Sequence, residues 1–209
     1  GPNAQLDLRG SFFASTSCEV VFPEVIVVSA NTPAAVPQLD INVGAPIGLR
    51  FVGSESGVII NRGTLRVDEG QRIGLVGGDI TVDGGSLEAV GGRIELAAVQ
   101  DSATLSFDFD APDFSLDDPQ TVLGGDISVT NASIVETSDR NGTGGGAIYI
   151  NGSDILLDQA SILFADTLGD QTADVGIFIR ADQLKILNGT QISSSIIENG
   201  TGQGGGVVI

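Results

Sequence analysis

Five aspartates gathered within eleven residues are the first feature of the sequence that could do chemistry. The stretch DFDAPDFSLDD contains Asp108, Asp110, Asp113, Asp117 and Asp118. Carboxylates at this density suit Ca²⁺ binding, and two of them could act as a general acid and a general base. However, the stretch has no Lys or Arg, and prolines lie within it and directly after it, as is typical of a loop. We therefore predict a solvated acidic insertion at residues 101–123 rather than a catalytic or metal site.

A second acidic spacing lies in the bend ADTLGDQTAD, where Asp166, Asp170 and Asp174 could gather one Ca²⁺. The bend lacks the glycine- and aspartate-containing nonapeptide that makes calcium binding specific in repeat toxins. Glycine triplets such as that in GTGGG do not follow a strand and open a helix, which a phosphate-binding loop requires. These motifs predict no catalytic residue, no metal ligand and no cofactor-binding residue.

The composition excludes several classes of partner. Of 209 residues, 27 are Asp or Glu and nine are Lys or Arg, which gives a formal net charge of −18 at pH 7. This charge repels the phosphates of nucleic acids and of anionic membranes, so we expect neither as a partner. Thirty glycines, with Val, Ile and Leu dominating the apolar residues, favour short strands joined by tight bends. The elements that position any site should therefore be β-strands.

Internal repeats indicate how those strands are arranged. Three segments align: GGDISVTNASIVETSDRNGTGGGAIYI, GSDILLDQASILFADTLGDQTADVGIFI and ADQLKILNGTQISSSIIENGTGQGGGVVI. Equivalent positions recur every 28 to 30 residues; they are Ile127, Ile155 and Leu184; Ile134, Ile162 and Ile192; and Ile150, Ile179 and Ile209. A shorter copy upstream, GGDITVDGGSLEAVGGRIEL, places Ile80, Leu87 and Ile94 at the same three positions.

Apolar and polar residues alternate within each repeat, as where Ile127 and Val129 flank Ser128. Three short strands cannot bury an apolar face alone, but stacked units give each strand two parallel neighbours. The pattern predicts an all-β parallel β-helix, with coils of 28–30 residues over residues 124–209. Asn131 and Asn188 should lie at corners, because asparagine tolerates left-handed backbone.

Three stretches resemble the filamentous haemagglutinin-like exoproteins of cyanobacteria, which are exported by two-partner secretion. They are GPNAQLDLRGSFFAST, GLRFVGSESGVIINRGTLRVDEGQRIGLVGGDITVDGGSLEAVGGRIELAAV and the repeat GGDISVTNASIVETS. The resemblance implies a right-handed β-helix that is secreted or held on the outer surface of a Gram-negative-type bacterium, after export through an outer-membrane β-barrel transporter. It also implies that the chain begins inside the secretion domain, after the family's NPNGI motif. Residues 1–100 would then be the remainder of that domain, and residues 124–209 the repeats.

Proteins of that family are associated with adhesion or with haem utilisation. Haem iron takes His, Met, Cys or Tyr as an axial ligand, and the chain offers no His, no Met, one Cys (Cys18) and one Tyr (Tyr149). Tyr149 lies at an outward strand position, and Cys18 fits a packed, small apolar side chain. We predict no haem and no other cofactor.

Two functions remain compatible with the sequence. We expect a non-catalytic extracellular module that serves as a stalk or surface-attachment scaffold. The alternative is a carbohydrate-active β-helix, a lyase or hydrolase, which needs acids and bases converging on one side, whereas Arg140, Arg180 and Lys185 are scattered across the repeats. The expected partners are the transporter, a cell-surface or matrix polysaccharide, and a second copy of the chain, joined end to end through the open strand at residues 207–209.

Overall fold

The computed structural model describes residues 3–23, 27–29, 45–53, 56–108, 115–116, 123–139, 144–168, 176–197 and 204–209. These residues form short β-strands, so the predicted all-β class is confirmed. Within the same ranges, no helix has the length and apolar character needed to span a membrane.

Three sheets of parallel strands enclose the core, and in each sheet neighbouring strands are hydrogen-bonded to one another. Sheet A contains β1 (Gln5–Leu8), β7 (Thr64–Val67), β10 (Ser86–Glu88), β15 (Ile134–Glu136), β18 (Ile162–Phe164) and β22 (Gln191–Ser193). Sheet B contains β2 (Phe12–Ser15), β8 (Arg72–Gly77), β11 (Arg93–Ala98), β16 (Ala147–Asn151), β20 (Ile177–Arg180) and β24 (Val207–Val208). Sheet D contains β6 (Ile59–Asn61), β9 (Ile80–Asp83), β14 (Ile127–Thr130), β17 (Asp154–Leu157) and β21 (Gln183–Ile186).

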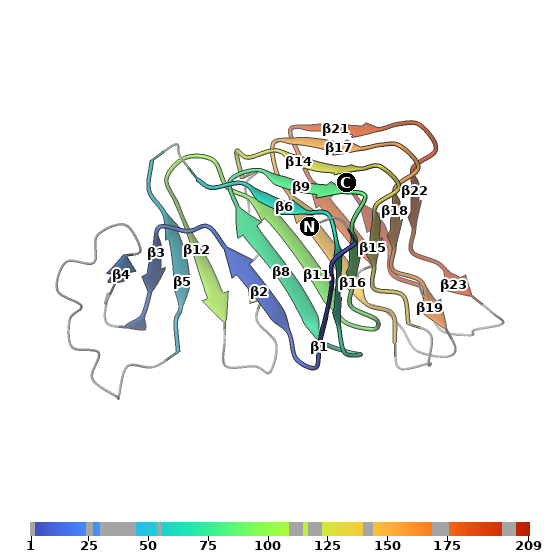
Figure 1. The fold of residues 1–209 in the computed structure, drawn as a ribbon, viewed down its shortest axis with the longest axis horizontal. Helices are drawn as coiled ribbons and strands as arrows, with labels where there is room; N and C mark the ends of the chain where they lie inside the picture. Colours follow the sequence, from blue (N-terminus) through green and yellow to red (C-terminus); the bar gives the residue numbers. More distant parts are fainter. Residues whose placement is uncertain are drawn as a thin grey trace.

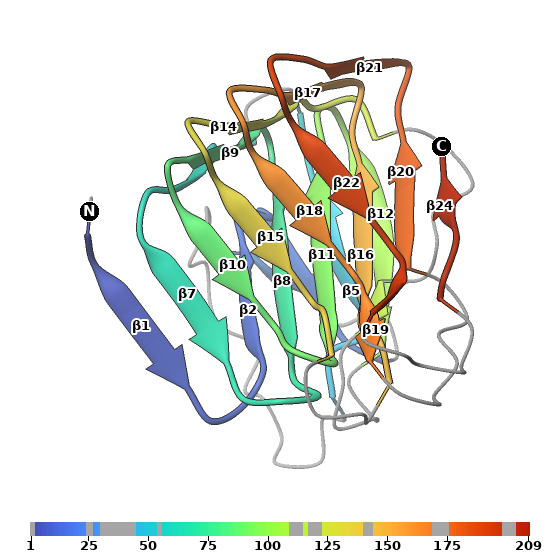
Figure 2. The ribbon, with the colours of Figure 1, turned by 90° about the vertical axis from the view of Figure 1, so that its right-hand side faces the viewer.

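The chain visits the three sheets in a fixed order. β7, β8 and β9 pass through sheets A, B and D, and β10, β11 and β14 then repeat the passage. β15, β16 and β17 follow the same order, as do β18, β20 and β21. A small pair, β19 (Thr167–Leu168) with β23 (Ile196–Ile197), lies in the turns between sheets A and B. We call each passage a coil, and Figures 1 and 2 show successive coils side by side.

The ladder predicted for sheet D is confirmed. Ile127 pairs with Ile155, Ile155 pairs with Leu184, and Ile80 lies on the other side of Ile127. Ile80, Ile127 and Ile155 are fully buried in the apolar core that the three sheets share, and Leu184 packs against it. In-register parallel pairing thus stacks like residues on like residues from coil to coil.

The equivalence predicted for sheet A is wrong by one residue at both ends, because Leu87 pairs with Val135 rather than with Ile134. Ile134 pairs with Ile162 as predicted, but Ile162 pairs with Gln191, while Leu163 pairs with Ile192. Ile134 and Ile162 are half-buried on the outer face. The inward residues are Leu65, Leu87, Val135, Leu163 and Ile192. Because side chains alternate between the two faces of a strand, a shift of one residue exchanges the inner and outer sets.

In sheet B the upstream copy is shifted by two residues, which leaves each side chain on its predicted face. Leu96 pairs with Ile150, the position that the sequence had predicted for Ile94, and Ile94 pairs with Ile148. The predicted match of Ile150 with Ile179 is confirmed.

The corners between sheets D and A use left-handed backbone, as predicted for Asn131 and Asn188, whose φ angles are 58° and 48°. Gln159 takes this place in the coil between them, with φ of 55°. Both Asn amides also link coils, because Asn188 Nδ2 donates to Asp158 Oδ1 at 2.7 Å and Asn131 Nδ2 donates to Asp83. These bonds offset the cost of about 1–2 kcal/mol that left-handed backbone imposes on an L-residue.

A separate antiparallel sheet, sheet C, covers part of the outer face of sheet B. Its strands, in spatial order, are β13 (Ser115–Leu116), β12 (Ala103–Asp108), β5 (Gly48–Phe51), β3 (Glu19–Val21) and β4 (Val27–Ser29). Phe51 and Leu105 pack with Val76 and Ala97 of sheet B in a second apolar cluster. Figure 1 shows sheet C on the far side of sheet B from sheet A. Two strands therefore lie within the predicted insertion of residues 101–123, and the division of the chain at residues 100 and 124 stays a prediction.

Candidate functional site

The acidic stretch of residues 108–118 can be placed only in part. Asp108 ends β12, where its backbone pairs with Ser115 of β13. Asp110, Asp113, Asp117 and Asp118 lie outside the described residues. That this stretch holds neither a catalytic nor a metal site stays a prediction.

Asp166, the first carboxylate of the second candidate, is tied into a turn. Its Oδ1 accepts hydrogen bonds from Ser193 Oγ at 2.6 Å and from the backbone N–H of Ser195 at 2.8 Å. Asp170 and Asp174 lie outside the described residues. In the part of the chain that the structure describes, no group of three Asp, Glu, Cys or His side chains could hold a metal ion.

Tyr149 and Cys18, the residues considered as haem ligands, make contacts within the protein. The Arg93 guanidinium lies 3.8 Å from the centre of the Tyr149 ring, and the Phe178 ring centre lies 5.9 Å from it. Cys18 is half-buried, with its Sγ 4.0 Å from the carbonyl oxygen of Val52. Tyr149 faces outward, as the alternation predicts. Its ring packs between the side chains of Arg93 and Phe178.

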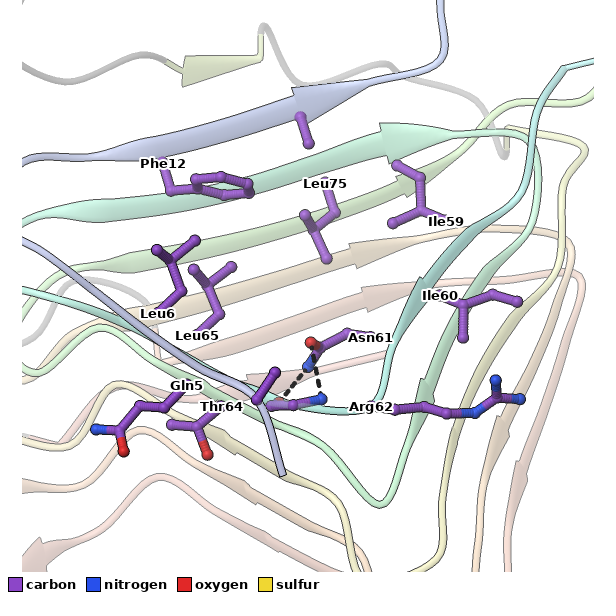
Figure 3. Close-up of a pocket in the computed structure, with 13 residues that line it drawn as sticks. Gln5, Leu6, Phe12, Ile59, Ile60, Asn61, Arg62, Thr64, Leu65 and Leu75 are labelled. Atoms are coloured by element: carbon purple, nitrogen blue, oxygen red, sulfur yellow. Dashed lines mark hydrogen bonds between the residues drawn. The ribbon is translucent and has the colours of Figure 1, made fainter. Parts of the chain in front are cut away.

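A pocket of about 260 Å³ lies at the end of the stack nearest the N-terminus (Figure 3). β1, β2 and β6 are the edge strands of their sheets at this end, so the shared core reaches the surface between them. Apolar side chains from all three sheets form the walls: Leu6, Phe12, Ala14, Ile59, Leu65 and Leu75. The pocket can therefore receive apolar side chains.

Asn61 and Arg62 form a polar rim on this pocket. Asn61 Nδ2 donates to the carbonyl oxygen of Gly63 at 3.0 Å, and Arg62 Nε donates to Asp83 Oδ2 at 2.8 Å. The hydrogen bond from Arg62, followed by that from Asn131, holds the pKa of Asp83 below its ordinary value of 3.8. The described residues that line the pocket include no Asp or Glu, so they supply no carboxylate for acid or base chemistry.

A row of charged and aromatic side chains on the outer face of sheet B was not predicted from the sequence. Glu95, Tyr149 and Phe178 are paired in register across β11, β16 and β20. Arg93 forms an ion pair with Glu95, whose side chain is almost fully buried, and the Arg180 guanidinium lies 5.0 Å from the Phe178 ring centre. The pairing of Tyr149 with Phe178 could have been found from the sequence, because the two residues lie 29 residues apart, one period of the repeat. Residues 101–123, whose sequence lacks the repeat, break the period between β11 and β16, and this concealed the pairing of Glu95 with Tyr149.

Comparison with known proteins identifies the family. A family model of the TPS secretion domain, the domain of two-partner secretion, matches residues 1–150. The chain belongs to this family. Possession of a TPS secretion domain indicates a two-partner secretion exoprotein, secreted across the outer membrane of a Gram-negative-type bacterium with a transporter as its partner. The resemblance to two-partner secretion exoproteins is thereby confirmed. Neither a curated protein nor a solved structure matches the chain.

The match to the TPS secretion domain ends within β16, although the core does not end there. Ile148 and Ile150 of β16 pair with Ile177 and Ile179 of β20, and all four side chains are buried in the shared core. The coils beyond residue 150 therefore complete the packing of the secretion domain.

Proposed function

We propose that the chain is a non-catalytic extracellular module of a secreted, filamentous adhesin-like exoprotein of cyanobacterial type, which serves as a stalk or surface-attachment scaffold. The observation that supports this proposal best is the in-register stacking of coils around one continuous core. Such a stack is extended along its length, and it leaves the outward side chains that sheet C does not cover available for recognition.

The proposed architecture is a right-handed parallel β-helix. Each coil leaves sheet A, passes through sheets B and D, and returns to sheet A beside the strand it left. Connections that return to a parallel neighbour in the same sheet are right-handed in nearly all proteins, because of the twist of β-strands. The proposed location is the medium or the outer cell surface, reached through a β-barrel transporter, and the proposed ligand is a cell-surface or matrix polysaccharide.

The non-catalytic role is tested by asking whether the chain binds a polysaccharide without cleaving it. The purified chain is incubated with neutral and acidic polysaccharides, and both the bound fraction and the release of reducing ends or unsaturated uronates are measured. We expect binding of a polysaccharide with no product above the protein-free blank. Product that accumulates in proportion to protein concentration would instead support the carbohydrate-active alternative.

End-to-end self-association is part of the proposal. Val207, Val208 and Ile209 expose 44%, 48% and 73% of their surface at the last strand of sheet B. An open parallel strand above an apolar core favours addition of another strand. Sedimentation of the 209-residue chain should show concentration-dependent association. A monomer that stays monodisperse, and that a charged residue added after Ile209 does not change, would contradict this part.

A further inference from the structure

One of the three equivalent corners between sheets D and A contains a chemically reactive dipeptide. Each corner places two successive residues in left-handed backbone, and the pairs with their φ angles are Asn131–Ala132 (58° and 56°), Gln159–Ala160 (55° and 59°) and Asn188–Gly189 (48° and 78°). In an asparagine followed by glycine, the next backbone nitrogen can attack the side-chain amide, because glycine has no side chain to hinder the approach and its backbone rotates easily. The corner at Asn188 therefore differs from the other two in its chemistry and not in its fold.

The nitrogen that would attack belongs to Gly189. At the other two corners the equivalent N–H is bonded to the next coil. Ala132 donates to the carbonyl oxygen of Gln159 at 2.8 Å, and Ala160 donates to that of Asn188 at 3.0 Å. Within the part of the chain that the structure describes, the Gly189 N–H has no acceptor, because its corner joins β21 to β22, the outermost strands of sheets D and A. Only solvent therefore competes for this nitrogen.

The side-chain amide of Asn188 links two coils. Asn188 is exposed, and its Nδ2 donates to Asp158 Oδ1 of the preceding coil at 2.7 Å. The same oxygen accepts the backbone N–H of Gln159 at 2.6 Å. An ionised carboxylate is an acceptor only, so the link depends on the N–H of the asparagine amide. Loss of that amide would remove the link.

A second dipeptide of the same kind is protected by the fold. The asparagine–glycine pairs of the sequence are Asn141–Gly142, Asn151–Gly152, Asn188–Gly189 and Asn199–Gly200. The first and the last of them lie outside the described residues. Asn151 is 9% exposed, and its Oδ1 accepts the backbone N–H of Leu123 at 3.0 Å. The Gly152 N–H donates to the carbonyl oxygen of Arg180 at 3.1 Å. Both reacting groups of this pair are therefore bonded and buried, in contrast to those of the corner at Asn188.

We propose that Asn188 is a site of spontaneous deamidation, and that the carboxylate formed there weakens the joint between its coil and the preceding one. The Gly189 nitrogen gives up its proton to solvent and bonds to Asn188 Cγ, the Cγ–Nδ2 bond breaks, and ammonia leaves after taking up a proton. Water then opens the five-membered imide at one of its two carbonyl carbons. The product is aspartate, or isoaspartate when the main chain continues through the side-chain carbon. Water is the only co-reactant, so no enzyme or cofactor takes part.

Either product places a carboxylate where the joint needs a donor. The new carboxylate would face that of Asp158, and two carboxylates at hydrogen-bond distance repel each other while neither donates. Isoaspartate would also lengthen the main chain between β21 and β22, which lie on different sheets. The coil that contains Asn188 would then be held less firmly than the coils before it. The change is slow and irreversible, and it is independent of what the module binds.

Peptide mapping of the aged chain by mass spectrometry tests the reaction. The 209-residue chain is incubated at mildly alkaline pH, where the attacking nitrogen loses its proton more easily, and fragmentation of the peptides assigns each converted amide to its residue. We expect amide-to-acid conversion at Asn188 and none at Asn151 over the same period. No conversion at Asn188, or equal conversion at the two residues, would overturn the proposal.

Gly189→Ala is the matched variant for this experiment. Alanine already occupies the same left-handed position at Ala132 and Ala160, and a Cβ atom at Gly189 would meet no atom within 4 Å. The variant should keep the circular dichroism spectrum of the parent chain and lose the conversion at Asn188. Conversion that continues at the rate of the parent chain would contradict attack by the Gly189 nitrogen.

The effect on the joint is tested with Asn188→Asp, which supplies the aspartate product directly. We expect it to lower the melting temperature relative to the parent chain. Adding Asp158→Asn returns an N–H donor to the pair with the roles exchanged, so the double variant should recover most of the loss. An unchanged melting temperature for Asn188→Asp, or no recovery in the double variant, would show that deamidation leaves the joint intact and would overturn this half of the proposal.

Discussion

Single residues in the core are constrained from two sides, because each lies between its equivalents in neighbouring coils. Ile155 is 1% exposed and pairs with Ile127 below and Leu184 above. Ile155→Asp would bury a carboxylate with no partner, so we expect a loss of at least about 3 kcal/mol in the free energy of unfolding. Leu156→Asp, one residue on and on the outer face, should cost much less. Urea denaturation of both variants checks this, and equal stability of the two would contradict the ladder.

The environment of Asp83 predicts that the stability of the folded chain depends on pH. Its carboxylate accepts hydrogen bonds from Arg62 and Asn131, which lower its pKa in the folded chain below the ordinary 3.8. A group with a depressed folded pKa stabilises the fold above its unfolded pKa, and this contribution disappears as the pH falls through the folded value. The parent chain should therefore lose stability more steeply than Asp83→Asn below about pH 4. Denaturation curves at a series of pH values test this, and parallel pH profiles for the two chains would refute it.

At the scale of the element, the register of β18 can be tested by two neighbouring truncations. Leu163 is fully buried and pairs with Val135 and Ile192, whereas Ile162 is half-buried on the outer face. Leu163→Ala should cost about 2–5 kcal/mol in unfolding free energy, the range for a fully buried aliphatic side chain. Ile162→Ala should cost clearly less, and the reverse order would restore the register predicted from the sequence.

The same strand shows what the sequence could predict and what it could not. Ile127 and Leu184 lie in strands that alternate, ISVT and QLKI, and the period of 28 or 29 residues sufficed to place Ile155 between them although its own strand, DILL, does not alternate. β15 and β18 contain apolar residues on both faces, IV and ILF, so alternation could not select the inner set. Sheet C escaped prediction because its strands come from residues 19–51 and 103–116, which lack the period. The pairing of Glu95 with Tyr149 depends on the register across the second of these segments.

At the scale of the whole molecule, the apolar core continues past the end of the family match at residue 150. A chain cut to residues 1–150 would lose β20, which covers Ile148 and Ile150. Exposing apolar core residues of this kind costs about 1.5–3 kcal/mol for each large side chain, so the shortened chain should unfold at lower temperature and be cleaved faster by protease. A second chain cut at residue 186, after β21, retains the cover and serves as the control. Equal melting temperatures for the two shortened chains would contradict a core shared across residue 150.

The direction of the hydrogen bonds between coils has a mechanical consequence. These hydrogen bonds run along the axis of the stack, and Figure 2 shows the two ends of the chain on opposite sides of it. A force that pulls the two ends apart would therefore detach one coil at a time. The coil from Ile127 to Ile155 spans 155 − 127 = 28 residues, and that from Ile80 to Ile127 spans 127 − 80 = 47. At roughly 3.4 Å of extended chain per residue, they release about 95 Å and about 160 Å of length respectively. A stack of such coils would lengthen in steps under load, because single coils would be lost while the others stay folded.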